Sequence, residues 1–173
     1  MELWDIYDIN HIKKGKTVVR GDRIEEGDYR IMVHICIFNS EGKMLIQHRT
    51  STKDCWPGLW DLSAGGSAVS GDTSGKAAER EAFEEIGVKL DLENTLPRLS
   101  VNFNRGFDDI YLVEKDIDIN SLVLQKEEVA EVKWADADEI CRLIDEKVFI
   151  PYHKNLIRLF FDMRKSYGAI KHG

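Results

Sequence analysis

Residues 65–88 read Gly-Gly-Ser-Ala-Val-Ser-Gly-Asp-Thr-Ser-Gly-Lys-Ala-Ala-Glu-Arg-Glu-Ala-Phe-Glu-Glu-Ile-Gly-Val and join a glycine loop to a segment with helical periodicity. Polar residues that commonly cap helices precede residue 74, and Gly87 is a natural stop. Four apolar residues fall on one side at helical spacing, namely Ala78, Ala82, Phe83 and Ile86. The pattern predicts a helix over residues 74–86 whose apolar side faces the core.

The same segment carries three carboxylates that we expect to converge. Glu81, Glu84 and Glu85 stand at i, i+3 and i+4, so they share one patch of the helix, where like charges repel. Arg80 relieves only part of this repulsion. A hard cation such as Mg²⁺ or Mn²⁺ would neutralise the rest because it takes oxygen ligands, and the glycine pair 65–66 lets a backbone carbonyl approach as a further ligand. The alternative interpretation is a solvated acidic helix face.

The spacing of these residues resembles the signature of the Nudix hydrolases. That signature is Gly, five residues, Glu, seven residues and then Arg-Glu-apolar-x-Glu-Glu-x-Gly-apolar. This chain has Gly66, Asp72 and the run Arg80–Val88 at those positions, and only Asp72 departs from the pattern. In the family the corresponding Glu steadies the junction of loop and helix. Asp72 keeps the charge and is a good helix cap, so we expect the departure to be tolerated.

The resemblance implies a fold of the α+β class, with a mixed β-sheet packed between helices in an α/β/α sandwich. It covers about residues 30–148. The whole chain, residues 1–173, is then expected to be a single Nudix domain with an N-terminal β-hairpin and a C-terminal helix as accessory elements. The sequence further predicts a strand over residues 2–8 with a turn at Lys13-Lys14-Gly15, a helix over residues 136–147 capped by Asp136, and a helix over residues 152–167.

Hydrolysis of a diphosphate needs an activated water, neutralisation of charge on the phosphoryl oxygens, and a base. Divalent ions supply the first two. We expect Mg²⁺, with Mn²⁺ as the alternative, to be held by Glu81, Glu84, Glu85 and the carbonyl of Gly65. The resemblance implies that Arg80 orients the carboxylates, so catalysis is assigned to Glu81, Glu84 and Arg80.

The sequence leaves the identity of the general base open. Glu81 is the first candidate, and a glutamate outside the Nudix signature is the second. Glu127 and Glu128 stand just before a predicted strand, where relatives often place an extra acid, and we include Glu128 among the expected metal ligands. The alternative for this pair is solvated loop charge.

Residues 45–60 are also similar to type 1 isopentenyl-diphosphate isomerases, which share this fold. In those enzymes an Arg and a Lys that match Arg49 and Lys53 bind the substrate diphosphate, so we expect both residues to bind substrate here. The isomerases need a catalytic Cys where this chain has Gly65, and a His metal ligand where it has Ser67. Without the thiol, no group is placed to move protons across an unactivated alkene.

The sequence therefore predicts a Mg²⁺- or Mn²⁺-dependent hydrolase that cleaves a diphosphate linkage in a nucleoside diphosphate-X or a related small molecule. Two alternatives remain open. One is an isomerase-like protein. The other is a non-catalytic Nudix module that binds a nucleotide, although such modules usually lose the acids that this chain retains.

Composition restricts the partners. Lys and Arg number 24 and Asp and Glu 31, so the net charge is −7, which argues against non-specific binding to nucleic acid. The three cysteines form no Cys-x-x-Cys pair and predict reduced thiols in a cytoplasmic protein. No signal peptide is visible, and the longest apolar stretch, near residues 31–38, is too short to span a membrane. A homodimer through the N-terminal hairpin or the last helix stays open.

The sequence also suggests the burial of three side chains that precede the Nudix signature. Trp56 and Trp60 are expected in the core, with stacking on a ring of the substrate as the alternative. Cys55 is interpreted as a partly buried structural residue.

Overall fold

The computed structural model describes residues 1–171 of the chain. Its elements, in chain order, are β1 (Leu3–Tyr7), β2 (Lys13–Val19), β3 (Arg30–Phe38), β4 (Met44–Arg49), β5 (Trp60–Asp61), β6 (Ala64–Ser67), α1 (Ser74–Ile86), β7 (Leu99–Phe103), β8 (Gly106–Glu114), the 3₁₀ helix η1 (Ile119–Ser121), β9 (Val129–Ala135), α2 (Ala137–Asp145) and α3 (Lys154–Met163).

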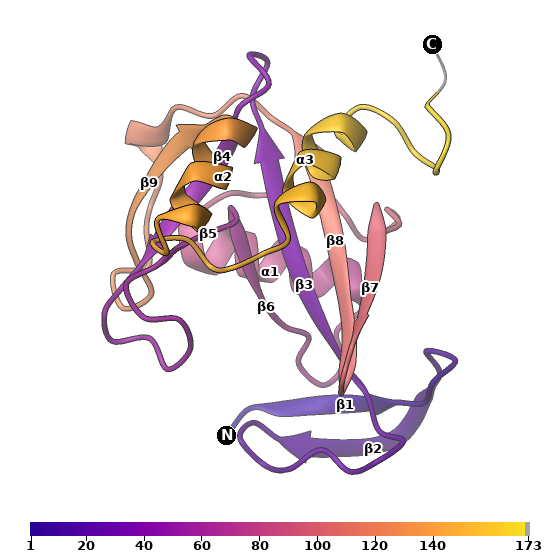
Figure 1. Cartoon of the computed structure of the whole chain (residues 1–173). Helices are drawn as coiled ribbons and strands as arrows, with labels where there is room; N and C mark the ends of the chain where they lie inside the picture. The colour runs from indigo at the N-terminus through magenta and orange to yellow at the C-terminus, as the bar shows by residue number, and fades with distance from the viewer. Residues whose placement is uncertain (172–173) are drawn as a thin grey trace.

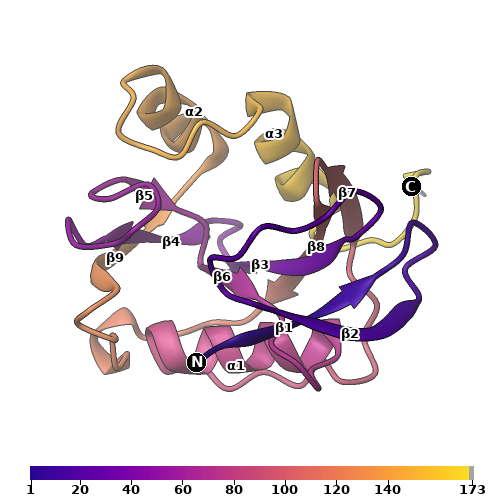
Figure 2. The ribbon, with the colours of Figure 1, turned by 90° about the horizontal axis from the view of Figure 1, so that it is seen from below.

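A seven-stranded mixed sheet forms the middle layer. Its main path runs β5-β4-β3-β8-β7, while β6 pairs with β3 and β9 pairs with β4. β3 and β8 are parallel, and the other pairs are antiparallel. α1 lies on one face of the sheet, and α2 and α3 lie on the other (Figures 1 and 2). The prediction of an α+β fold with a mixed sheet between helices is confirmed.

Strand β3 explains why the two faces hold separate cores. Its side chains alternate, so that Val33 and Ile35 pack in the core under α1, while Cys36 and Phe38 pack in the core under α2 and α3. A strand buried on both faces reads as a continuous apolar run, as this one does. His34 interrupts the run on the α2 and α3 face, where its Nε2 lies 3.3 Å from Oδ1 of Asp108.

The N-terminal hairpin forms a separate two-stranded sheet, and its predicted turn was wrong. Residues 13–15 lie in β2, and the chain turns earlier, between Asp8 and Ile12. The Asp8 carboxylate accepts hydrogen bonds from the backbone N–H groups of Asn10 and Ile12, and His11 has a φ of 62°. This side-chain to backbone pairing defines the turn locally, because Asp readily bonds its own backbone two residues on. Gly15, with a φ of 70°, sits where the β1–β2 register shifts.

Helix α1 has the predicted bounds. The Thr73 side chain accepts from the N–H of Lys76 at the first turn, and Gly87 ends the helix at a left-handed φ of 71°. Ala78, Ala82 and Ile86 are buried as predicted. Phe83 is 51% exposed, so its assignment to the core was wrong. The buried face instead turns toward the glycine loop, which brings Glu85 inside.

The two C-terminal helices follow their capping residues. α2 begins after Asp136, whose side chain accepts from the N–H of Glu139, as predicted. α3 is shorter than the predicted span and ends at Met163, where the Arg98 guanidinium donates to the Met163 carbonyl at 2.6 Å. That side chain satisfies the last turn and lets the chain leave the helix. No helix in the described residues is long and apolar enough to cross a membrane.

Candidate metal and diphosphate site

The Arg80 side chain hydrogen-bonds both to the glycine loop and to other residues of α1. Its Nη1 donates to Glu81 at 2.7 Å and to Glu84 at 3.3 Å. Its Nη2 donates to the Ser67 carbonyl at 3.0 Å, and both Nε and Nη2 lie 3.2 Å from Oδ2 of Asp72. One guanidinium therefore ties the helix to the loop. Asp72 still reaches it although the family has the longer Glu.

Glu81, Glu84, Glu85 and Glu128 form what we call the acid cluster. Glu85 is its most buried member, with 1% of its surface exposed. Its Oε2 accepts from Nε2 of Gln47 at 2.8 Å and from the N–H of Gly65 at 3.1 Å, and its Oε1 lies 3.9 Å from the Lys53 ammonium. Burial raises the pKa of Glu85 to about 8. The negative charge of Glu81 adds to this, while the Gln47, Gly65 and Lys53 contacts oppose it. A divalent cation would stabilise the ionised form that burial disfavours.

Glu81 lies directly against the glycine loop. A Cβ atom built on Gly66 would stand 2.4 Å from Cδ of Glu81, so any side chain there would displace the carboxylate. Glycine at this position therefore allows the carboxylate to approach the loop closely. Burial raises the pKa of Glu81, and the Arg80 guanidinium opposes this shift only in part.

Lys53 brings a fourth carboxylate into the cluster. Its ammonium pairs with Glu128 as well as with Glu85. Burial acts to raise the pKa of Glu128, but the Lys53 contact outweighs it, and the net shift is downward. Of the predicted acid pair, Glu128 thus joins the cluster, whereas the Glu127 side chain is exposed and this residue contributes its carbonyl to the Thr50 hydroxyl.

Arg49 makes its contacts elsewhere, with Asp61 and with residues 50–59, which we call the Trp56 loop. Its Nη2 donates to the Cys55 carbonyl at 2.7 Å, its Nε lies 3.2 Å from the carbonyls of Cys55 and Trp56, and its Nη1 donates to Asp61 at 3.2 Å. The predictions that Cys55 is partly buried and Trp56 is in the core were wrong, since both are exposed. Trp60 is half-buried.

The donors around Glu85 are those that a hard cation prefers. In the described part of the chain, no three acid, His or Cys side chains already stand at metal-binding spacing. Arg80 and Lys53 instead hold cationic groups among the carboxylates. Glu81, Glu84, Glu85 and Glu128 nevertheless form an all-oxygen donor set, in which Glu81 and Glu85 have raised pKa values, and such a set fits Mg²⁺ or Mn²⁺.

Sequence reasoning missed Gln47. Its side chain is 1% exposed and orients the Glu85 carboxylate from the neighbouring strand β4. A polar residue at a buried strand position is retained where it has a hydrogen-bond partner, and the only sequence signal was a glutamine directly after Met44-Leu45-Ile46.

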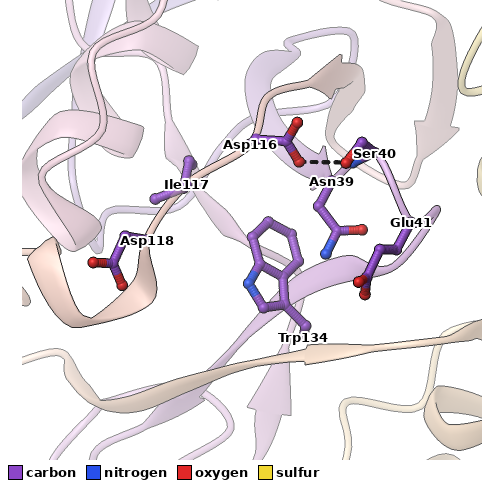
Figure 3. A pocket seen from close by; sticks show the side chains of 7 residues that line it. All are labelled: Asn39, Ser40, Glu41, Asp116, Ile117, Asp118 and Trp134. Carbon is purple, nitrogen blue, oxygen red and sulfur yellow. Dashed lines mark hydrogen bonds between the residues drawn. The ribbon is translucent and has the colours of Figure 1, made fainter.

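A separate cavity of about 490 Å³ lies at the β3–β4 hairpin (Figure 3). It shares no residue with the cluster around Glu85. Its lining consists of Asn39, Ser40, Glu41, Asp116, Ile117, Asp118 and Trp134. The Asp116 carboxylate accepts from the N–H of Ser40 at 2.8 Å, which closes the hairpin tip.

The glycine loop, α1 and the acid cluster match the architecture of an enzyme class known from other sequences. A sequence profile of the NUDIX domain matches residues 28–160, which is more than half of the chain. The chain therefore belongs to the Nudix family. With its named relatives, this makes it a hydrolase that acts on diphosphate linkages.

Two groups of relatives support this assignment. A Nudix hydrolase of Listeria monocytogenes is 45% identical over 152 residues, covering 88% of this chain and 90% of its own length. Nudix hydrolase 3 of Arabidopsis thaliana is 34% identical over 169 residues, covering 89% of this chain and 22% of its own length.

Solved structures share the fold at lower identity. DR0079 from Deinococcus radiodurans superposes with a TM-score of 0.73 at 22% identity, covering 91% of this chain and 98% of its own. A Caenorhabditis elegans Ap4A hydrolase complex superposes with a TM-score of 0.56 at 16% identity, covering 78% and 96%. A bifunctional NMN adenylyltransferase/ADP ribose pyrophosphatase from Francisella tularensis gives 0.59 at 20% identity, covering 78% and 41%.

Proposed function

We propose that this Nudix hydrolase is Mg²⁺-dependent, with Mn²⁺ as a substitute, and that it cleaves the diphosphate linkage of a nucleoside diphosphate-X. The observation that carries the proposal is the pair of acids on α1 that turn inward, the buried Glu85 and the half-buried Glu81. Glu81 lies against Gly66, and Glu85 accepts the N–H of Gly65, so both carboxylates meet the glycine loop on the same side of the helix. Structural needs alone would not favour a buried carboxylate beside a half-buried one at this spacing.

We propose Glu81, Glu84, Glu85, Glu128 and the Gly65 carbonyl as the metal ligands. When bound there, a divalent ion supplies an activated water and neutralises charge on the phosphoryl oxygens. The chain's own part is to fix the carboxylates. Gln47 and the Gly65 N–H hold Oε2 of Glu85, so Oε1, which faces the Lys53 ammonium at 3.9 Å, is the oxygen that would face a metal ion.

Arg80 and Lys53 have different proposed roles. Arg80 is tied to Asp72, Glu81 and Glu84, so we assign it the task of orienting carboxylates rather than contacting substrate. The Lys53 ammonium stands at the edge of the same cluster and would meet the diphosphate there. Arg49 stays a prediction as a second diphosphate contact, because its guanidinium here donates to the Trp56 loop.

For the proton, Glu81 is the proposed general base. Its pKa is raised by burial, which brings it nearer to the working pH and makes the carboxylate a better proton acceptor. Glu128 is the second choice, since its pKa is lowered overall despite burial, mainly through Lys53, and it is a weaker base.

The isomerase alternative conflicts with the space at Gly65. A Cβ atom there would lie 2.8 Å from the Val33 carbonyl, so the thiol that an isomerase needs cannot be added without moving strand β3. The non-catalytic alternative conflicts with the retention of Arg80, Glu81, Glu84 and Glu85.

We also propose that residues 1–173 form a single Nudix domain.

A panel of diphosphates tests the proposal. ADP-ribose, Ap4A, nucleoside triphosphates, nucleotide sugars, coenzyme A and isopentenyl diphosphate would be incubated with Mg²⁺, with Mn²⁺ or with EDTA, and the products identified by mass. We expect cleavage at the diphosphate in at least one nucleotide compound and none in EDTA. Isomerised isopentenyl diphosphate, or full cleavage in EDTA, would contradict the proposal.

A further inference from the structure

Trp56 differs from the other three tryptophans of this chain. Trp60 stacks on His48 at a centroid distance of 4.9 Å, the Arg30 guanidinium lies 4.3 Å from the ring centre of Trp4, and Trp134 packs against the core under α1. Within residues 1–171, no aromatic ring or cation stands against Trp56, and 51% of its surface is exposed. The indole is therefore available to a ligand, and tryptophan is enriched among the residues that dominate binding interfaces.

The backbone at Trp56 adopts an unusual conformation. Trp56 has a φ of 51°, in the left-handed region that a bulky residue seldom occupies. Such conformations persist only where surrounding contacts enforce them, and they gather at ligand-binding positions. Arg49 provides the enforcing contacts by donating to the carbonyls of Cys55 and Trp56, and Asp61 anchors Arg49 in turn.

The Trp56 loop is closed at its base, so the indole has a defined place. The N–H of Arg49 donates to the Leu59 carbonyl at 2.9 Å, and the N–H of Gly58 donates to the Thr50 carbonyl at 3.1 Å. The N–H of Thr50 in turn donates to the Glu128 carbonyl at 3.0 Å, which joins the loop to the acid cluster. Loops whose ends meet in this way are compact and frequently functional.

The same loop carries Lys53 into the acid cluster. Lys53 and Trp56 are three positions apart in the chain, so their Cα atoms lie at most about 11 Å apart. A ligand whose diphosphate meets Lys53 therefore has its attached group within reach of the indole.

We infer that Trp56 is the stacking platform for a planar ring carried by the diphosphate substrate, and that Arg49 positions it. This rests on the proposed function and narrows it, because it selects a nucleoside diphosphate-X over an aliphatic diphosphate. Stacking on an indole is tolerant of the ring's identity, since every base presents a π-face. The platform thus favours a base without choosing among bases.

Steady-state kinetics on ADP-ribose test the inference. For Trp56→Ala we expect KM to rise about tenfold with kcat within about twofold, and Trp56→Phe should recover most of the loss because it restores a ring. Tyr167→Ala, which removes another exposed aromatic far from the cluster, should behave as wild type. An unchanged KM in Trp56→Ala would overturn the inference, as would an equal loss on isopentenyl diphosphate.

A binding experiment separates this inference from the proposed function. AMP carries a base and a phosphate but no diphosphate, so it can be titrated without turnover while tryptophan fluorescence is read. Quenching in the wild type that is lost in Trp56→Phe supports the platform even if no diphosphate is hydrolysed. Equal quenching in both proteins, or none in the wild type, overturns it.

Discussion

The glycine loop with α1 and the Trp56 loop lie side by side at one cluster of carboxylates, yet they are built in different ways. In the first, Arg80 and close glycine contacts fix Glu81 and Glu85 within 20 residues of sequence. In the second, Arg49 holds a strained backbone that exposes an indole. Under the proposed function, the glycine loop and α1 carry the chemistry of the phosphate. The Trp56 loop, which Arg49 and Asp61 hold in place, carries the recognition of what is attached to the phosphate.

The largest effect should come from Glu85→Gln. We expect kcat/KM to fall by about 10²–10³-fold, because a buried metal-binding carboxylate is lost. Glu41→Gln, at an exposed hairpin position, is the matched control. Retention of wild-type turnover in Glu85→Gln would break the assignment of chemistry to α1.

The same substitution should stabilise the metal-free protein at high pH. The pKa of Glu85 is about 8 in the fold against an ordinary 4.5, so the stability that this group contributes is complete below pH 4.5 and is lost as the pH rises through 8. Glu85→Gln removes this loss. We expect its free energy of unfolding to exceed that of the wild type by about 5 kcal/mol at pH 9 and by only about 1 kcal/mol at pH 5. Urea titrations in EDTA measure both, and a difference independent of pH would contradict the burial argument.

Gly66→Ala sharpens the comparison by separating chemistry from folding. The added Cβ meets the movable end of Glu81, so we expect activity to fall about 100-fold while the melting temperature changes by only a few degrees. Gly106→Ala is the contrasting control, because its Cβ would lie 2.3 Å from the Arg30 backbone carbonyl. That variant should lose thermal stability instead. Equal stability losses in the two variants would show that Gly66 serves the fold alone.

Arg49→Lys probes the other region. Lysine keeps the charge but cannot reproduce the several directed donors of the guanidinium. We expect faster amide hydrogen exchange across residues 50–59 and a KM raised about tenfold, with little change in kcat. Arg105→Lys, which loses one exposed contact to the Glu25 carbonyl, controls for the chemistry of the substitution. Unchanged exchange in the Trp56 loop would contradict the clamp.

Lys53→Met should give the smallest effect, because the loss of this charge favours metal binding but disfavours diphosphate binding. Removal of one positive charge beside Glu85 and Glu128 should tighten Mg²⁺ binding about threefold and weaken diphosphate binding by a similar factor. Lys43→Met on the β3–β4 hairpin is the control. Calorimetry of Mg²⁺ binding measures the first effect, and a weaker Mg²⁺ affinity in Lys53→Met would contradict the geometry of the cluster.

The two regions also differ in how far the sequence predicted them. α1 was predicted with its bounds because the Thr73 cap region, the helical period and Gly87 are all local signals. Trp56 and Cys55 were assigned to wrong environments, because their exposure depends on Arg49 and Asp61. No local pattern encodes a contact of that kind.

Phe83 and Gln47 show the same difference between features set by local sequence and features set by tertiary packing. Phe83 satisfied the helical period but was left exposed, since small alanines and Glu85 occupy the buried face. Gln47 went unnoticed because its partner Glu85 lies 38 positions away in sequence. Tertiary packing decides both features, and periodicity in one segment cannot report on it.

Calorimetric Mg²⁺ titration in two buffers with different ionisation enthalpies tests the central claim most directly, because it counts the protons released as the metal binds. With a pKa of about 8, Glu85 is mostly protonated at pH 7 and must ionise to serve as a ligand. We predict release of about one proton at pH 7 in the wild type, little at pH 9, and almost none in Glu85→Gln. No proton release at pH 7 in the wild type, or equal release in Glu85→Gln, would contradict the account.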